Sequence, residues 1–341
     1  MAASTTSRST TGLDLDIAIR VEGLSKLYGD VQAVDGVDFA VRRGELFGFL
    51  GPNGAGKTST LNMLTGLARL DAGTISIDGI DCTRNPKAAQ HLIGVVPDES
   101  NLYPELTGFE NLCFCAALYG MRRREREARA RELLAQFGLA EAADRGFGGY
   151  SRGMKRKLTI AAGIIHDPPI LFLDEPTTGI DVAGARQIRQ LIAGLHDAGT
   201  TIFLTTHYIE EAERLCERIA FIVRGRIVRT DAVAELMQPT RDRHVLLFAV
   251  SSSDAGIVEA LAEACPGCRV AGAGPGRIRV EADAPILIAP LVRLLEEHGV
   301  EVTEARQVRP SLEDVFVEVT GIEAGAMQKD KEKGGKGGGA A

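Results

Sequence analysis

The chain has 341 residues, enough for about two domains, and its 45% hydrophobic and 25% charged content is typical of a globular protein. A formal net charge of −7 argues against a general nucleic-acid binder. No apolar run approaches the roughly 18 residues that a membrane-spanning helix needs. We therefore expect a globular protein that has no nucleic-acid partner and does not cross a membrane by itself.

The cysteines and the first residues bear on the compartment. The cysteines are Cys82, Cys113, Cys115, Cys216, Cys265 and Cys268. Six are too few for a disulfide framework in so long a chain, and the Ser/Thr-rich start has no signal-peptide pattern. We expect reduced thiols, a cytosolic protein and a disordered tail over residues 1–16. Cys265 and Cys268 lack the second pair that structural zinc requires, so we interpret them as a turn with two thiols.

The first elements in chain order are short strands around a loop and a helix. Residues 17–41 alternate and turn like a strand pair, and the apolar residues 46–50 predict a buried strand. A short helix over 58–66 and a further strand over 74–78 follow. From 106 to 138, apolar residues recur at three- and four-residue steps, which predicts helix.

Three continuous apolar runs, at 170–173, 201–205 and 219–223, then alternate with helical stretches at 182–195 and 208–218. Continuous apolar strands linked by helices are typical of parallel strands that are buried on both faces. The pattern therefore predicts an α/β core.

The order of the predicted strands and helices changes near Pro239. The order strand, helix, strand, strand, helix, strand over residues 241–321 predicts a small α+β domain of ferredoxin-like type, ending in one more helix. The Lys/Gly-rich residues 322–341 predict a disordered tail.

Residues 51–58 match the phosphate-binding loop G-x-x-x-x-G-K-[ST] in full, between a predicted strand and a predicted helix. Glycines let backbone N–H groups turn toward an anion, and the helix N-terminus adds partial positive charge. Lys57 is expected to reach the β- and γ-phosphates, and the Thr58 hydroxyl to bind Mg²⁺. The candidate ATP-binding residues are Gly51, Pro52, Asn53, Gly54, Ala55, Gly56, Lys57, Thr58 and Ser59.

Two carboxylates end the apolar strand at 170–173. Asp174 is placed to orient Mg²⁺ through water, and Glu175 to polarise the attacking water. His207 follows the strand at 201–205, at the sheet edge where such folds hold ligands, and a neutral imidazole there could bond the γ-phosphate. The predicted catalytic residues are Lys57, Glu175 and His207.

Upstream of Asp174, the segment Tyr150-Ser151-Arg152-Gly153-Met154 resembles the signature motif of ABC transporter ATPase subunits. The usual motif is Leu-Ser-Gly-Gly-Gln. Its departures here resemble the multidrug and antibiotic-export branch, as does the closing segment at 310–317. The resemblance spans about 17–240 and implies a P-loop ABC cassette with an antiparallel β subdomain and a helical subdomain at about 97–155.

The resemblance also implies further site residues. Ser151, Gly153 and Asp181 would contact the ATP that the opposite subunit holds, and Tyr28 would stack on adenine. Asp98 stands where the family has a Mg²⁺-binding Gln, and a carboxylate can also ligate this ion.

One cassette carries one P-loop and one signature, so the implied working unit is a homodimer, or a heterodimer with a related cassette, around two ATP molecules. It would drive a separate integral-membrane permease, for export, from the cytoplasmic face of the cell membrane. The helical subdomain is the expected docking surface. The alternative is a soluble ABC-type ATPase acting on ribosomes or DNA, although this chain has neither a second cassette nor a long coiled-coil insertion. A P-loop kinase or GTPase would lack the signature and His207.

Overall fold

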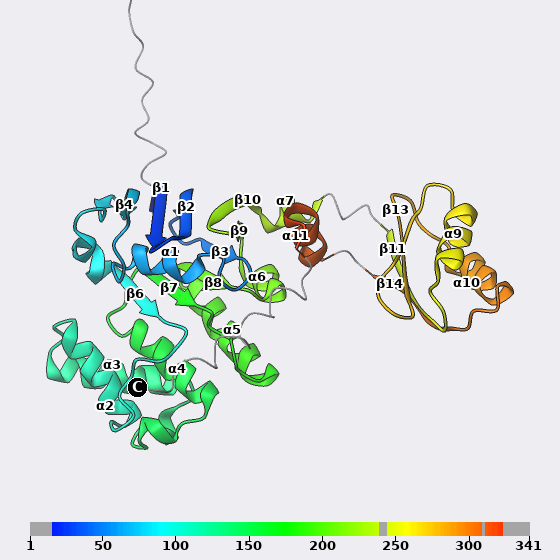
Figure 1. Cartoon of the computed structure of the whole chain (residues 1–341). Helices are drawn as coiled ribbons and strands as arrows, with labels where there is room; N and C mark the ends of the chain where they lie inside the picture. The colour runs from blue at the N-terminus through cyan, green and yellow to red at the C-terminus, as the bar shows by residue number, and fades with distance from the viewer. Residues whose placement is uncertain (1–15, 239–243, 309–310, 323–341) are drawn as a thin grey trace, which may run out of the picture. The chain divides into compact units, whose positions relative to one another are not determined.

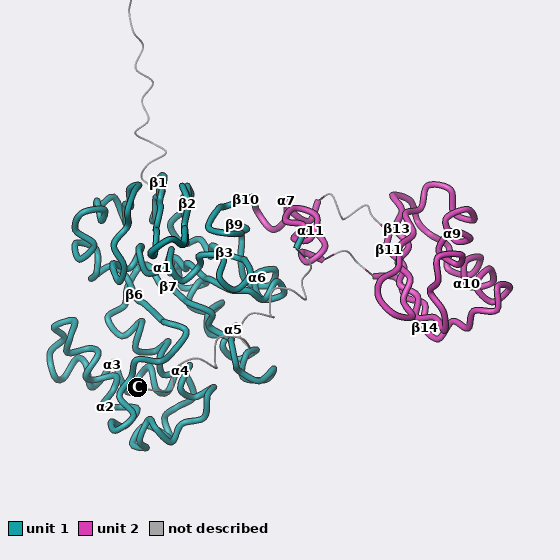
Figure 2. Tube along the Cα trace, viewed as in Figure 1, with its two compact units in different colours: residues 1–231, 322–341 teal, residues 232–321 magenta. Residues whose placement is uncertain are grey.

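The computed structural model describes residues 16–238, 244–308 and 311–322. The tails predicted to be disordered, 1–16 and 322–341, lie almost entirely outside the described residues. The chain divides into two compact units, one formed by the described residues up to Asp231 together with Ile322, the other by Ala232–Gly321 (Figure 2). The sequence placed the domain limit at residue 240. Helix α7 (Val233–Leu236) instead falls in the second unit, where it contacts α11 (Leu312–Thr320).

The first unit contains two sheets (Figure 1). A four-stranded sheet has the order β2-β1-β4-β5 with antiparallel neighbours, and a six-stranded sheet has the order β10-β9-β3-β8-β7-β6. The pairs β3–β8, β3–β9, β6–β7 and β7–β8 are parallel, as the apolar runs predicted. The strands are β1 (Ile17–Tyr28), β2 (Val31–Arg42), β3 (Leu46–Leu50), β4 (Ala72–Ile77), β5 (Ile80–Asp81), β6 (Ile93–Val96), β7 (Ile170–Asp174), β8 (Thr201–Thr206), β9 (Arg218–Val223) and β10 (Arg226–Ala232).

Aromatic side chains join the two sheets in one core. The Phe203 ring of β8 lies 5.4 Å from that of Phe49 in β3 and 5.7 Å from that of Phe172 in β7, centroid to centroid. Phe39 of the antiparallel sheet lies 5.7 Å from both Phe47 and Phe203. Strands β3, β7 and β8 are buried along their whole length, which fixes their carboxyl ends rigidly at one edge of the sheet.

The helices of this unit cover the parallel sheet or form the insert after β6. They are α1 (Lys57–Leu64), α2 (Gly108–Leu118), α3 (Arg123–Gln136), α4 (Arg152–Gly163), α5 (Val182–Asp197) and α6 (Ile209–Leu215). The stretch 106–138 is two helices and not one, because the chain leaves α2 at Gly120, whose φ of 77° ends a right-handed helix. Helices α2, α3 and α4 contact one another and form the insert.

The second unit is a four-stranded antiparallel sheet of order β12-β13-β11-β14, with α9 and α10 on one face (Figure 1). Phe248, Leu261, Ile278 and Leu295 are completely buried between the sheet and these helices. The elements are β11 (His244–Val250), α9 (Ala255–Ala264), β12 (Arg269–Gly272), β13 (Arg277–Ala282), α10 (Ile288–Glu297), β14 (Val302–Val308) and α11. The unit thus has a core of its own.

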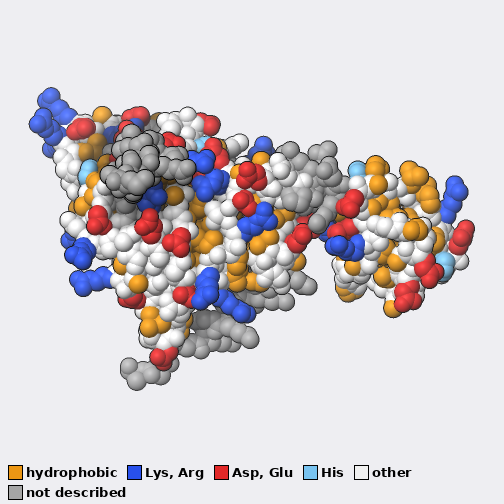
Figure 3. All heavy atoms as spheres, turned by 90° about the horizontal axis from the view of Figure 1, so that it is seen from above, with side chains coloured by type: hydrophobic (Ala, Val, Ile, Leu, Met, Phe, Trp, Pro, Cys, Tyr) orange, Lys and Arg blue, Asp and Glu red, His pale blue; other side chains and the backbone are white. Residues whose placement is uncertain are grey.

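Among the described residues, no helix is both long and apolar enough to cross a membrane. On the face seen in Figure 3, acidic and basic side chains are interspersed.

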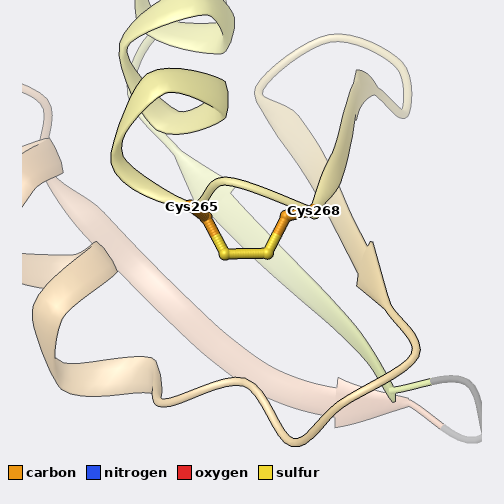
Figure 4. Close-up of a disulfide and its surroundings, with 2 residues drawn as sticks. All are labelled: Cys265 and Cys268. Carbon is orange, nitrogen blue, oxygen red and sulfur yellow. A yellow bond between two sulfur atoms is a disulfide. The ribbon is translucent and has the colours of Figure 1, made fainter.

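The expectation that all thiols are reduced is wrong for one pair. A disulfide joins Cys265, at the end of α9, to Cys268, just before β12 (Figure 4). The intervening turn contains Gly267 at a φ of 94° and brings the two Cα atoms to 5.4 Å, within the range that a disulfide spans. Burial raises the pKa of the other four cysteine thiols, which disfavours their reactive thiolate form.

We expect mild oxidation of the purified protein by oxidised glutathione to close this pair and no other. Alkylation under denaturing conditions without reductant should then modify four cysteines in the mass spectrum, and six after reduction. The Cys268→Ser variant, with five cysteines, is the matched control: Cys265 can then form only a mixed disulfide with glutathione, which the mass spectrum distinguishes from the bridge. Six modified cysteines in the oxidised, unreduced protein would contradict the pairing.

Candidate functional site

The loop between β3 and α1 depends on two glycines. Gly56 has a φ of 104°, and a Cβ there would collide with the carbonyl oxygen of Ala33. A Cβ on Gly51 would collide with the carbonyl oxygen of Ile222. The loop therefore packs backbone to backbone against neighbouring strands, and its path into α1 is fixed.

Lys57 is the first residue of α1, and its side chain is only 6% exposed. Its Nζ donates to the carbonyl oxygens of Gly51, at 2.7 Å, and Pro52, at 3.1 Å, and lies 3.2 Å from Oε1 of Glu175. A buried ammonium is stable only with such partners. Lys57 thus joins the P-loop to the end of β7.

Asp174, the last residue of β7, is held by two hydroxyl groups. Thr58 Oγ1 donates to its Oδ2 at 3.0 Å, and Thr205 Oγ1 donates to its Oδ1. Burial raises the pKa of Asp174, and the hydrogen bonds from Thr205 and Thr58 offset part of that rise.

Glu175 is buried and has a φ of 48°, in the left-handed region that non-glycine residues rarely adopt. Nδ1–H of His207 donates to its Oε2 at 2.6 Å, and Thr178 Oγ1 donates to the same oxygen at 3.0 Å. Burial favours the neutral carboxyl, but the His207 hydrogen bond and the charge of Lys57 outweigh it, so the pKa of Glu175 lies below its ordinary value.

One pocket brings most of the predicted site together. It is lined by Val31, Gln32, Ala33, Asn53, Gly54, Gly56, Lys57, Thr58, Ser59, Asp98, Glu175 and Arg224. Asp174 and His207 contact this lining from outside the pocket: Asp174 accepts a hydrogen bond from Thr58, and His207 donates one to Glu175. The remaining P-loop residues, Gly51, Pro52 and Ala55, support the loop without lining the pocket.

Sequence reasoning missed Arg224. It has a φ of 50° and stands in the turn between β9 and β10, next to Gly225, whose N–H donates to Ala55 O at 2.9 Å. That bond ties the turn to the P-loop and brings an exposed guanidinium into the pocket. An arginine in a strand–strand turn has no local signal that points to a site more than 160 residues away in sequence.

Four further predicted residues, outside the P-loop and the carboxylate cluster, also do not line this pocket. Tyr28 is 47% exposed at the end of β1, with Lys26 Nζ 5.2 Å from the centre of its ring. Ser151 caps α4 by accepting a hydrogen bond from Met154 N–H at 3.3 Å, and is exposed. Gly153 is the second residue of α4 and Asp181 is the N-cap of α5, and neither lines this pocket. The contact of Ser151, Gly153 and Asp181 with nucleotide stays a prediction about an assembly of two chains, and the stacking of Tyr28 on adenine stays a prediction about a single chain.

The oxygen donors of the site fit a hard cation. The Thr58 hydroxyl and the Asp174 carboxylate are 3.0 Å apart and present oxygens of the kind that Mg²⁺ prefers. In the described part of the chain, no three His, Cys, Asp or Glu side chains converge on a metal position.

A P-loop at the carboxyl end of a parallel strand, facing two buried carboxylates and a histidine, defines a P-loop nucleoside triphosphatase. The family model described as ABC transporter matches residues 34–178. The chain is 38% identical over 306 residues to the daunorubicin resistance ATP-binding protein DrrA2 of Streptomyces coeruleorubidus, covering 89% of this chain and 95% of that protein. It is 40% identical over 305 residues to a fluoroquinolones export ATP-binding protein of Mycobacterium tuberculosis, covering 89% and 93%.

A dimeric structure of the ATP-binding cassette MJ0796, bound to ADP and Pi, is similar with a TM-score of 0.59 and 28% identity, covering 63% of this chain and 98% of that one. The chain therefore belongs to the ABC transporter family, as an ATP-binding subunit of the antibiotic-export branch. It is an ATPase whose hydrolysis powers transport. None of the relatives described here supports the alternative role on ribosomes or DNA.

Acidification should change the stability of variants at Glu175 and Asp174 in opposite ways, because the pKa of Glu175 is lowered and that of Asp174 is raised. Glu175, with its lowered pKa, contributes stability at neutral pH that is lost as the pH falls through that value. Asp174, with its raised pKa, is destabilising when ionised, and that cost disappears as the pH falls. Between about pH 7 and pH 3, Glu175→Gln should therefore lose less free energy of unfolding than the wild type, and Asp174→Asn more. Urea denaturation across this range tests it, and changes of the same sign in both variants would contradict it.

Proposed function

We propose that Lys57, Glu175 and His207 are the catalytic residues of this exporter ATPase. Glu175 polarises the attacking water, and Lys57 neutralises the β- and γ-phosphates. His207 donates Nδ1–H to Glu175 and Nε2–H to the γ-phosphate, which requires the doubly protonated ring in place of the neutral imidazole expected from the sequence. The observation that carries the proposal is the pair of short contacts on Glu175, 3.2 Å from Lys57 and 2.6 Å from His207. They keep the carboxylate ionised in a buried position, as a group that orients water must be.

Mg²⁺ is the proposed cofactor beside ATP. Thr58 would ligate it directly and Asp174 through water, with Asp98 as a further ligand because it lines the same pocket. The bound ion would supply positive charge that neutralises the phosphates.

We also propose a head-to-tail dimer, either a homodimer or a heterodimer with a related cassette. Ser151, Gly153 and Asp181 would reach the ATP on the opposite P-loop, where the exposed N-terminus of α4 favours an anion. Tyr28 would stack on adenine. The dimeric MJ0796 cassette supports this arrangement by similarity.

The permease would dock on the insert, residues 97–155, from the cytoplasmic face of the membrane. The insert carries exposed large apolar side chains on and before α2, namely Tyr103, Phe114 and Leu118. The relatives named for daunorubicin resistance and fluoroquinolones export suggest drug-like cargo for the complex. Residues 241–321 would be an accessory domain of ferredoxin-like type, in keeping with their strand order.

Glu175→Gln should bind Mg-ATP without hydrolysing it and so accumulate the closed dimer. Light scattering should give about twice the monomer mass with Mg-ATP and the monomer mass without it. The matched control, Glu175→Gln with Lys57→Ala, should stay monomeric, because it lacks the cation that neutralises the phosphates. A monomer under all conditions, with ATP bound, would exclude the dimer.

The transport role is tested by purifying tagged Glu175→Gln protein from its native membranes. A polytopic membrane protein in near-equal amount is expected in the mass spectrum, and would be the permease. A single variant that carries Ser at positions 103, 114 and 118 in place of Tyr103, Phe114 and Leu118 should no longer copurify with that membrane protein but should still bind ATP. Soluble partners alone would overturn the proposal.

A further inference from the structure

A buried arginine connects the helix that follows the signature to the proposed catalytic carboxylate. Arg156 lies in α4, one turn after Arg152, and its side chain is only 6% exposed. Buried arginines are rare unless every donor direction is occupied, since the guanidinium remains charged.

The guanidinium of Arg156 bridges two segments. One terminal N–H group donates to Pro97 O at 2.5 Å, and the other donates to Glu175 O at 2.8 Å. Oδ1 of Asp98 lies 3.6 Å from the second nitrogen. Burial lowers the pKa of Arg156, and the negative charge of Asp98 offsets part of that effect.

The contact with Glu175 falls on a constrained backbone. Glu175 has the φ of 48° noted above, a conformation that persists only where its surroundings hold it. Its N–H donates to the carbonyl and the hydroxyl oxygen of Thr205 in β8, at 3.1 and 3.2 Å. Its carbonyl oxygen accepts from Arg156. Strand β8 therefore holds one side of this residue, and helix α4 the other.

A second contact joins the same helix to the segment after Pro97. Thr159, in α4, donates to Ser100 Oγ at 2.8 Å. The helix is thus fixed to residues 97–100 at two points about one helical turn apart. A displacement of α4 would move Arg156, and with it both Asp98 and the carbonyl of Glu175.

We infer that Arg156 is a positioning residue for hydrolysis, and that Asp98 is its counter-ion. Arg156 fixes the backbone of Glu175 from the signature helix, so that the carboxylate is aligned only when α4 is correctly seated. This inference rests on the role proposed for Glu175. It replaces the role of Asp98 as a Mg²⁺ ligand, proposed above, with that of a counter-ion, which an amide at the same position could not perform.

A double-mutant cycle on the full-length protein tests the pair. Arg156→Gln should lower kcat by about tenfold or more while the Kd for ATP stays within about twofold, because substrate contacts are intact and only the alignment of Glu175 changes. Asp98→Gln should lower kcat by leaving a buried cation without its anion. The double variant should retain at least about threefold more activity than the product of the two single losses predicts.

Two further measurements separate this role from others. The Kd for a fluorescent ATP analogue, measured with Mg²⁺ and with EDTA, shows whether Asp98→Gln acts through the metal. If the ratio of the Kd in EDTA to the Kd in Mg²⁺ is the same in Asp98→Gln and in the wild type, the counter-ion role is supported. If Asp98→Gln only abolishes the effect of Mg²⁺ on this Kd, the counter-ion role is overturned. Midpoints of thermal unfolding without nucleotide should fall in both single variants and recover in the double. Lys157→Gln, which removes a neighbouring charge from α4, is the matched control and should change neither kcat nor the midpoint.

Arg156→Lys covers the case in which Arg156→Gln fails to fold. It keeps the charge beside Asp98, but a single ammonium lacks the fork that reaches two carbonyls, so kcat should still fall about tenfold. Wild-type kcat in Arg156→Lys or Arg156→Gln, or strictly independent losses in the cycle, would overturn the inference. Glu175→Gln, assayed alongside, tests its basis: if it hydrolyses ATP like the wild type, the role proposed for Glu175 fails and not merely that of Arg156.

Discussion

Two carboxylates, Asp174 and Glu175, end a strand that is buried along its whole length, and balancing their charge is the constraint on which the site depends. Moving an ionised carboxylate out of water costs several kcal/mol unless it is paired. The fold meets this cost with different partners for each residue. Asp174 accepts from two neutral hydroxyls, whereas Glu175 faces Lys57 and His207.

That difference explains how adjacent carboxylates can perform different tasks. Burial raises the pKa of Asp174, and its two hydroxyl donors offset only part of that rise, so added positive charge would stabilise its ionised form. Glu175 is already compensated, and its ionised form is favoured. The carbonyls of Gly51 and Pro52 keep Lys57 in place beside it. Phosphate oxygens are charged and therefore stronger acceptors than these carbonyls.

The parts of the fold with strong local patterns could be predicted from sequence. Strands β3, β7 and β8 are continuous apolar runs, and the P-loop is fixed by glycines at definite spacing, so their type and their shared sheet edge followed directly. The break at Gly120 and the disulfide of Cys265 were missed, because each depends on backbone geometry that residue type alone does not decide. Arg224 was missed because the residues it joins are far apart in the chain.

Arg156 illustrates the same limit in another form. In sequence it is one cation among Arg152, Lys155 and Lys157 and looks like part of a solvated helix face. Only the packing of α4 against residues 97–100 and against Glu175 shows that it is the buried member of the group. Hydrophobic periodicity cannot identify Arg156 as buried, because that pattern assigns apolar residues to buried positions and charged residues to exposed ones.

Asp98 and Arg152, which appeared to be unrelated departures from the family motif, belong to one electrostatic arrangement. Both line a second cavity, together with Lys155 and Arg156, where α4 faces the segment after β6. The first turn of α4 contains no acidic residue, although a helix N-terminus favours negative charge, so its cations and its dipole add to the same positive field. Asp98, together with Glu99 in the same cavity, places negative charge beside these cations, whereas an amide at position 98 would remove the carboxylate that lies 3.6 Å from Arg156. The acidic residue at 98 is thus the electrostatic counterpart of a helix whose first six residues include four cations, Arg152, Lys155, Arg156 and Lys157.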